Sequence, residues 1–306
     1  MVHIDMEVKI LNFIKKHKIL TGILILFSIY VYANYTRVVD YEKNLDTSDK
    51  HYINELYKSD DRIYNTKLTE NVQKMYDLIL TKSKNHVSLV NIDLEEFGCS
   101  SYSVCGNYIT LATHALFVDH PELMNFAGYT WVYKDNKLTL SIKFSYLLPF
   151  KDMIGVLRIE KIISDIKEET KEMTEKEKII YVYDWMGKHN YYDKMFMYTS
   201  KNQSIYNVFV KGNAVCAGFA KASHLIFSQI GIESYIVQGT STGEHMWNIV
   251  KYDGKYYYFD STASVSIDES SNYHYYGLQQ TNLNFYVMRH PTWYPKVETE
   301  NMFDDI

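Results

Sequence analysis

The alternation of apolar and polar positions divides the first half of the chain into helices and a hairpin. Apolar residues recur at three- and four-residue spacing in 68–82, which predicts a helix with one buried face. A second helix is expected in 106–123. Two β-rich runs flank Asp135-Asn136 and predict a hairpin. We interpret 67–150 as a small α+β extension.

The same patterns predict three helices in the second half. One is expected in 152–170, and the capping-box sequence from Thr174 to Glu177 predicts the start of the next. The third helix carries Cys216 and is expected to end at Gly231, because glycine favours the left-handed backbone that follows many helices.

Three β-rich runs then follow, in 232–240, 244–252 and 255–264. Asp253-Gly254 separates the second run from the third, and this dipeptide is a strong signal for a two-residue hairpin turn. The predicted fold class is therefore α+β. We expect a cysteine-bearing helix packed on an antiparallel sheet, preceded by the smaller extension.

The N-terminus predicts passage across a membrane. No charged residue occurs in 19–36, which is just long enough to span a bilayer, and Lys15, Lys16 and Lys18 would hold its start in the cytoplasm. A signal peptide cleaved near Ala33 is the alternative, and a buried helix of a soluble protein is a third. We expect a single-pass membrane protein with the later chain extracytoplasmic, or a secreted protein.

Composition narrows the classes of partner. The 306 residues are 46% hydrophobic, enough for a sizeable core. The net charge is −5, so the chain has no excess of positive charge that would bind phosphates, and nucleic acid is not expected as a partner. The sequence contains no nucleotide-binding loop, calcium loop or other cofactor signature, and we predict no cofactor.

The three cysteines fall into two groups. Cys99 and Cys105 are close enough in sequence for a disulfide outside the cytoplasm. With His114 and His120 they could instead form a zinc or redox site, although the spacings are unusual for zinc. Cys216 remains unpaired, and an unpaired thiol in an exported protein is a candidate for a reactive group.

Cys216 lies where a turn gives way to a helix. Free N–H groups and the positive end of the helix dipole favour a thiolate there. If Asn213 caps the helix, Cys216 occupies the third helical position. The alternative is a buried cysteine that acts as a small apolar side chain. A thiol nucleophile also needs a base within hydrogen-bond reach, and that base needs an orienting group.

The hairpin predicts both partners. A two-residue turn at Asp253-Gly254 places Trp247 opposite Asp260. His245 is two residues from Trp247, so it shares a face with Asp260 as a diagonal neighbour. His245 is therefore the candidate base and Asp260 its orienting group.

Other histidines and aspartates fit the role of base or orienting group less well. His224 is about 12 Å from Cys216 along the helix axis, and Asp253 belongs to the turn. We interpret His189 and His290 as surface or core residues.

Two segments of the sequence resemble a known family. AVCAGFAKASHLIFSQIGIESYIVQG and HMWNIVKYDGKYYYFDSTAS are similar to the core of the transglutaminase-like superfamily, cysteine enzymes of papain-like fold that include bacterial members. The family motif matches Cys216, His245 with Trp247-Asn248, and Asp260. The resemblance covers roughly 175–265. The chain departs from many bacterial members at Ala217 and at 261–264, which concerns the substrate pocket more than the triad.

The resemblance implies acyl transfer by a Cys-His-Asp triad through a thioester, with Trp247 and Asn248 as supporting residues. Water as acceptor makes a peptidase or amidase, and an amine makes a crosslinking transglutaminase. We expect a protein or peptide substrate, such as a cell-wall peptide. The alternative is an inactive surface module used for binding or assembly.

These observations predict six segments of the chain. They are a cytoplasmic N-terminal segment (1–18), a membrane anchor or signal peptide (19–36), a polar spacer (37–66), the α+β extension (67–150), a transglutaminase-like catalytic domain (151–292) and an acidic, solvated C-terminal tail (293–306).

Overall fold

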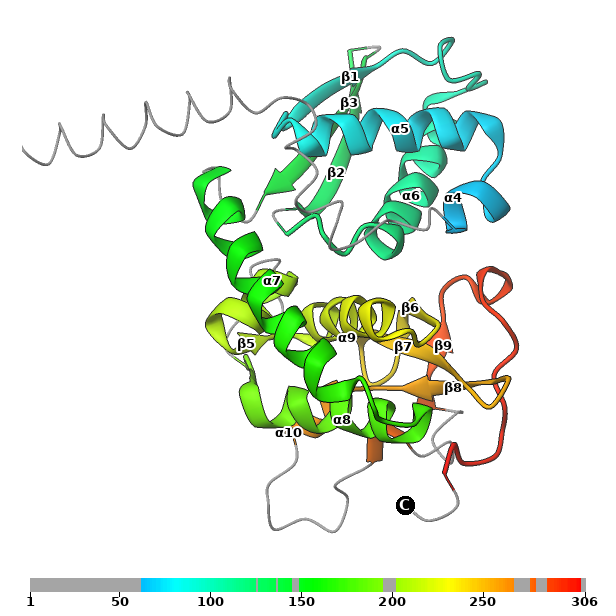
Figure 1. The fold of residues 1–306 in the computed structure, drawn as a ribbon. Helices are drawn as coiled ribbons and strands as arrows, with labels where there is room; N and C mark the ends of the chain where they lie inside the picture. Colours follow the sequence, from blue (N-terminus) through cyan, green and yellow to red (C-terminus); the bar gives the residue numbers. More distant parts are fainter. Residues whose placement is uncertain are drawn as a thin grey trace, which may run out of the picture. The chain divides into compact units, whose positions relative to one another are not determined.

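The computed structural model describes most of the chain beyond the N-terminal segments (Figure 1). The described residues are 62–124, 126–135, 137–144, 149–194, 202–266, 276–278 and 285–303. The predicted membrane anchor at 19–36 lies outside them, as does the spacer up to residue 61. In the described ranges, no helix is both long and apolar enough to span a membrane.

Among the described residues, the extension contains three helices and a three-stranded sheet, and its first helix begins at Arg62, inside the predicted spacer, because Ile63 is buried in the core of the extension. Its helices are α4 (Arg62–Lys67), α5 (Glu70–Lys84) and α6 (Tyr102–Asp119). Its antiparallel strands are β1 (Leu89–Ile92), β2 (Phe126–Lys134) and β3 (Lys137–Phe144), in the order β1-β3-β2. The predicted hairpin is the β2–β3 pair.

The predicted apolar face of α5 is buried, at Val72, Met75, Tyr76 and Ile79. The second helix starts earlier than predicted, because Ser101 caps α6 by accepting a hydrogen bond from the Val104 N–H.

Two long helices lead into the cysteine region. They are α7 (Pro149–Thr170) and α8 (Glu175–His189). The capping box is formed as predicted: Glu177 accepts from the Thr174 N–H at 2.8 Å, and the Thr174 hydroxyl accepts from the Glu177 N–H at 3.3 Å. The described chain also contains shorter elements: β4 (Tyr191–Tyr192), the π-helix η2 (Asn207–Lys211), β5 (Asn213–Ala214), α10 (Thr262–Ser266), η3 (Tyr276–Leu278) and η5 (Pro291–Trp293).

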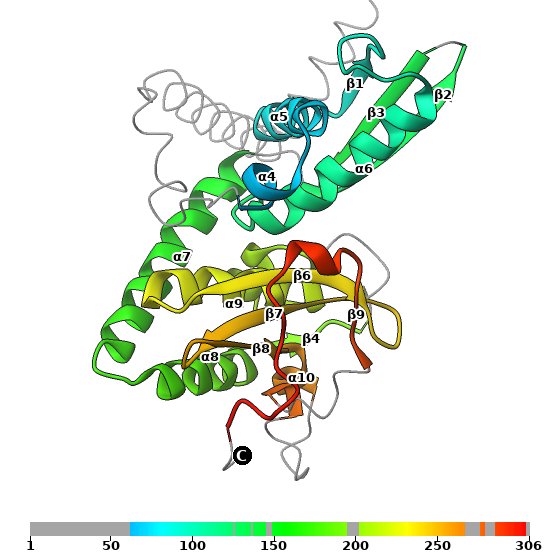
Figure 2. The same ribbon diagram turned by 90° about the vertical axis from the view of Figure 1, so that its right-hand side faces the viewer.

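The second sheet has four antiparallel strands, with α9 (Cys216–Ile230) against it (Figure 2). In the order β8-β7-β6-β9 they are β8 (Lys255–Phe259), β7 (Glu244–Tyr252), β6 (Ser234–Thr240) and β9 (Val287–Met288). The α+β class is therefore confirmed, and Gly231 ends α9 in the left-handed conformation as predicted.

The extension and the cysteine helix share a hydrophobic core. Ala217 and Ala220 of α9 and Met246 of β7 belong to the same buried cluster as Ile79 of α5 and Leu116 of α6. Small side chains of α9 therefore contact the extension as well as the sheet.

The prediction of a solvated C-terminal tail is wrong for part of that segment. Met302 and Phe303 are only 4% and 5% exposed, and the Phe303 ring packs edge-on against Tyr252. The backbone N–H of Glu298 also donates to the carbonyl of Tyr256 at 2.8 Å. The reason is that burial of these two large apolar side chains in the core is favourable, although the sequence around them is acidic.

Candidate active site

Cys216 is the first residue of α9 and follows a short extended segment. Asn213 and Ala214 pair with Tyr191 and Tyr192 in a parallel bridge, and Val215 takes the N-cap position. The prediction that Asn213 caps the helix is therefore wrong: its backbone is extended, and its side chain donates to Asp193 at 3.1 Å. Val215 supplies no side-chain cap. The N–H groups of Cys216 and Ala217, the first two of the helix, have no acceptor in a preceding helical turn and thus lie beside the thiol.

A buried polar network holds the segment before Cys216. Asp193 accepts from the side-chain amides of Asn213 and Asn202. Asn202 in turn accepts from Asn207 at 2.6 Å, and its backbone carbonyl accepts from the Val215 N–H at 2.9 Å. Sequence analysis missed Asp193, Asn202 and Asn207, because they form no periodic pattern.

His245 and Asp260 lie together as the hairpin predicts. Asn248 pairs with Phe259, which extends the register to the predicted 247–260 alignment, and Asp253 and Gly254 have the positive φ angles of such a turn (48° and 76°). His245 Nε2 is 2.8 Å from Asp260 Oδ2, with the two side chains only 13% and 7% exposed.

The surroundings of His245 favour its cation. Burial lowers the pKa of the imidazole, but the charge of Asp260, its hydrogen bond and a hydrogen bond to Cys216 raise this pKa to about 10. Burial also raises the pKa of Asp260, yet the charge of His245 and hydrogen bonds from its neighbours bring the pKa below its ordinary value. The structure thus brings all three predicted triad residues together.

Tyr286 is a further residue of this cluster that sequence analysis missed. Its hydroxyl donates to Asp260 Oδ2 at 2.8 Å, and the Thr262 N–H donates to Asp260 Oδ1 at 3.0 Å. The Tyr286 ring lies 5.9 Å from the His245 ring and 5.0 Å from the Trp247 ring, centroid to centroid. Nothing in the sequence distinguishes it from the other 28 tyrosines.

The two predicted supporting residues lie on opposite faces of β7. Trp247 is 1% exposed and stacks at 5.9 Å and 20° with His245. Asn248 is fully buried, and its side chain donates to the carbonyl of Ala220 at 2.9 Å. Trp247 therefore contacts the imidazole, whereas Asn248 fixes β7 against α9.

Comparison with known proteins identifies the region that contains these residues. Residues 164–261 match a sequence model described as Transglutaminase-like superfamily. This region is a transglutaminase-like domain. The match includes Cys216, His245 and Asp260 and confirms the resemblance seen in the sequence.

Two solved structures are similar to the chain at low identity. One, described as a TGase, is 16% identical with a TM-score of 0.34, over 49% of this chain and 48% of that one. The chain thus spans about half of its length. The other, a candidate cysteine protease from Cytophaga hutchinsonii, is 14% identical with a TM-score of 0.33, over 53% and 65% of the two chains. No curated protein matches the chain.

The remaining cysteines lie outside the transglutaminase-like domain. Cys99 and Cys105 form a disulfide at the start of α6, so neither sulfur is a thiolate ligand for zinc. His120 contacts Glu122, and His114 contacts His290 at 3.0 Å. Among the described residues, no three potential ligands gather as a metal site would require.

The residues that the sequence analysis set aside as triad candidates have other contacts in the structure. His224 is bonded to Ser234 at 2.8 Å, and His189 Nδ1 is 2.9 Å from the carbonyl oxygen of Trp185. Asp253 forms the hairpin turn.

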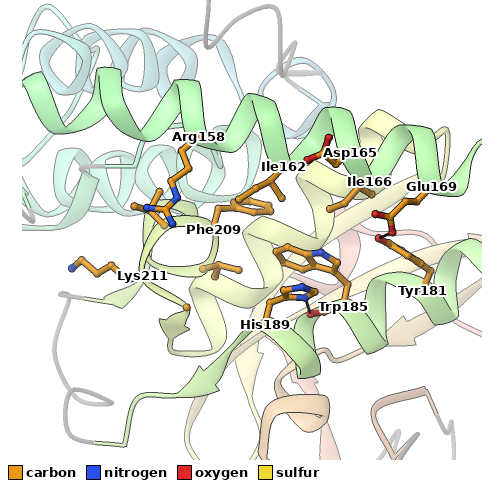
Figure 3. A pocket seen from close by; sticks show the side chains of 13 residues that line it. Arg158, Ile162, Asp165, Ile166, Glu169, Tyr181, Trp185, His189, Phe209 and Lys211 are labelled. Atoms are coloured by element: carbon orange, nitrogen blue, oxygen red, sulfur yellow. Dashed lines mark hydrogen bonds between the residues drawn. The ribbon is translucent and has the colours of Figure 1, made fainter.

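A separate hollow of about 480 Å³ lies between α7, α8 and η2 (Figure 3). Trp185 and Phe209 form much of its wall, with Arg158 and Lys211 toward one end and Glu169 toward the other. None of its lining residues belongs to the triad. The hollow is therefore separate from the cluster formed by Cys216, His245 and Asp260.

Proposed function

We propose that this protein is a cysteine enzyme that cleaves or transfers amide bonds of protein or peptide substrates. The observation that carries the proposal is the position of His245, which contacts both Asp260 and Cys216. Cys216 is also the one cysteine of the chain that is not in the disulfide. Its thiol is therefore available as a nucleophile.

Before substrate reacts, His245 already holds the proton it has taken from Cys216, so the pair rests as a thiolate and an imidazolium. The thiolate attacks the carbonyl carbon of the substrate amide and forms a tetrahedral oxyanion, which the backbone N–H of Cys216 is placed to stabilise at the start of α9. As the C–N bond breaks, His245 returns the proton to the leaving amine, and a thioester remains on Cys216. Asp260 holds the imidazole and stabilises its cation.

A second nucleophile resolves the thioester. Water, deprotonated by His245, releases a carboxylic acid and regenerates the thiol, which makes the enzyme a peptidase or amidase. An amine in the same role forms a new amide and makes it a transglutaminase. We favour hydrolysis, because water is the default acceptor and no amine pocket is evident in the sequence.

We further propose that the enzyme acts outside the cytoplasm, on surface proteins or cell-wall peptides. The uncharged stretch at 19–36 supports this location. The disulfide between Cys99 and Cys105 supports it independently, because such bonds are rare in cytosolic proteins.

The test uses the full chain in detergent with glutamine-bearing peptides and cell-wall peptides, with and without a primary amine. Mass spectrometry distinguishes cleavage, deamidation and amine incorporation. We expect no product from Cys216→Ala. Asp260→Asn should reduce turnover by about a hundredfold or more. Asp253→Asn, the same change at the exposed turn of the same hairpin, should leave it unchanged. If the wild-type chain alters none of the peptides, the proposal fails.

A further inference from the structure

Asp260 is held at both of its carboxylate oxygens. Oδ1 accepts from the Thr262 backbone N–H at 3.0 Å, whereas Oδ2 accepts from two side chains, His245 and Tyr286, both at 2.8 Å. The Asp260 side chain is only 7% exposed, so water has little access to replace a lost donor. Tyr286 therefore fixes the orientation of the oxygen that binds the imidazole.

The Tyr286 ring restrains the imidazole as well. Trp247 and Tyr286 each lie 5.9 Å from the His245 ring, at interplanar angles of 20° and 27°. The two aromatic rings also contact each other at 5.0 Å. His245 thus lies in an aromatic environment to which Tyr286 contributes one ring, and rotation of the imidazole away from Cys216 would disturb this packing.

A glycine allows Tyr286 to reach this position. Tyr286 directly precedes β9, which pairs with β6 at Gly239 and Thr240. Gly239 is also the residue opposite His245 in the β6–β7 register. A Cβ atom at Gly239 would lie 2.1 Å from the Val287 carbonyl oxygen and 2.7 Å from the Trp247 ring. Only glycine lets β9 approach so closely.

We propose that Tyr286 is a positioning residue of the active site, which holds Asp260 and His245 in the arrangement that presents the imidazole to Cys216. This role rests on the proposed function of the triad. It adds a residue that lies outside the matched region 164–261 and directly before the edge strand β9.

The test measures the thiol and not turnover. Because the other two cysteines form the disulfide, alkylation of the unreduced full chain by iodoacetamide reports on Cys216 alone. We expect Tyr286→Phe, which removes only the hydroxyl, to slow alkylation at pH 7 by about tenfold, as loss of a hydrogen bond to a buried charge predicts. Tyr252→Phe, on the same sheet beside Phe303, is the matched control and should alkylate at the wild-type rate.

A double-mutant cycle separates positioning from general stability. If Tyr286 acts through Asp260, Tyr286→Phe should have no further effect in an Asp260→Ala background. An equal loss in both backgrounds, or a Tyr286→Phe rate within twofold of the wild-type rate, would overturn the proposal.

Gly239→Ala provides a second variant if Tyr286→Phe does not fold. It should displace β9 and slow alkylation, whereas Gly243→Ala, where an added Cβ meets nothing within 4 Å, should not. Equal rates for these two alanine variants would contradict the role of β9. Because no amide substrate is involved, failure of the peptide assay and failure of this inference remain distinguishable.

Discussion

At the scale of single residues, the charge state of His245 depends on one carboxylate. Burial lowers its pKa, whereas Asp260, and to a smaller extent Cys216, raise it to about 10. In Asp260→Asn the burial effect remains and only the smaller effect of Cys216 opposes it. We expect the pKa of His245 to fall to or below its ordinary value of 6.5.

NMR titration of the histidine ring measures this change directly, with the signal assigned by its loss in His245→Gln. In the wild-type chain the ring should remain protonated from about pH 6 to about pH 9, because its pKa lies above this range. Asp253→Asn should retain that behaviour. A wild-type ring that titrates near pH 6.5 would show that Asp260 does not control the imidazole.

Some residues of the site can be predicted from the sequence and others cannot, for a physical reason. His245 and Asp260 could be predicted because a two-residue turn fixes the register of a hairpin, and the register fixes which side chains share a face. Tyr286 and Asp193 could not be predicted, because each reaches the site through a loop or a short strand whose path depends on tertiary contacts.

At the scale of the element, the β7–β8 turn sets the alignment of the site. Gly254 has φ = 76°, a conformation that L side chains rarely adopt. We expect Gly254→Ala to lower the free energy of unfolding by about 1–2 kcal/mol. Gly243→Ala, at a glycine without a positive φ, is the control. Urea denaturation compares the two variants, and equal midpoints would mean that the turn conformation contributes no measurable stability.

At the start of α9, the sequence pattern predicts the helix but not its N-cap residue. The apolar pattern locates the helix, and Gly231 marks its end, but the pattern does not distinguish Asn213 from Val215 as the N-cap. That choice is made by the pairing of Asn213 with Tyr191 and by the bond from its side chain to Asp193. Both contacts join segments that are about twenty residues apart, so local preferences do not determine them.

At the scale of the whole molecule, a buried lysine lies where α9 and the extension meet. Lys221 is 1% exposed, and its ammonium lies 3.4 Å from the centre of the Phe117 ring of α6. Burial lowers its pKa to about 7, against a smaller opposing effect from Glu122. Between about pH 7 and pH 10.5 the unfolded chain therefore binds a proton that the folded chain does not, so stability rises with pH in this range.

Lys221→Met should remove this dependence. We expect the stability of the methionine variant, relative to the wild-type chain, to be greater at pH 7 than at about pH 9.5, as measured by urea denaturation at both pH values. Lys74→Met, at an exposed lysine of α5, serves as the control. A stability difference between wild type and Lys221→Met that is the same at both pH values would contradict the burial argument.

The buried C-terminal residues have a consequence for recombinant fragments. The family match ends at residue 261, but Leu278, Met302 and Phe303 complete the core around α8 and α9. A gene truncated at the boundary of the match would encode a polypeptide with an uncovered hydrophobic surface and without Tyr286. Such a fragment should aggregate on expression, whereas one that continues through residue 303 retains the side chains that cover this surface.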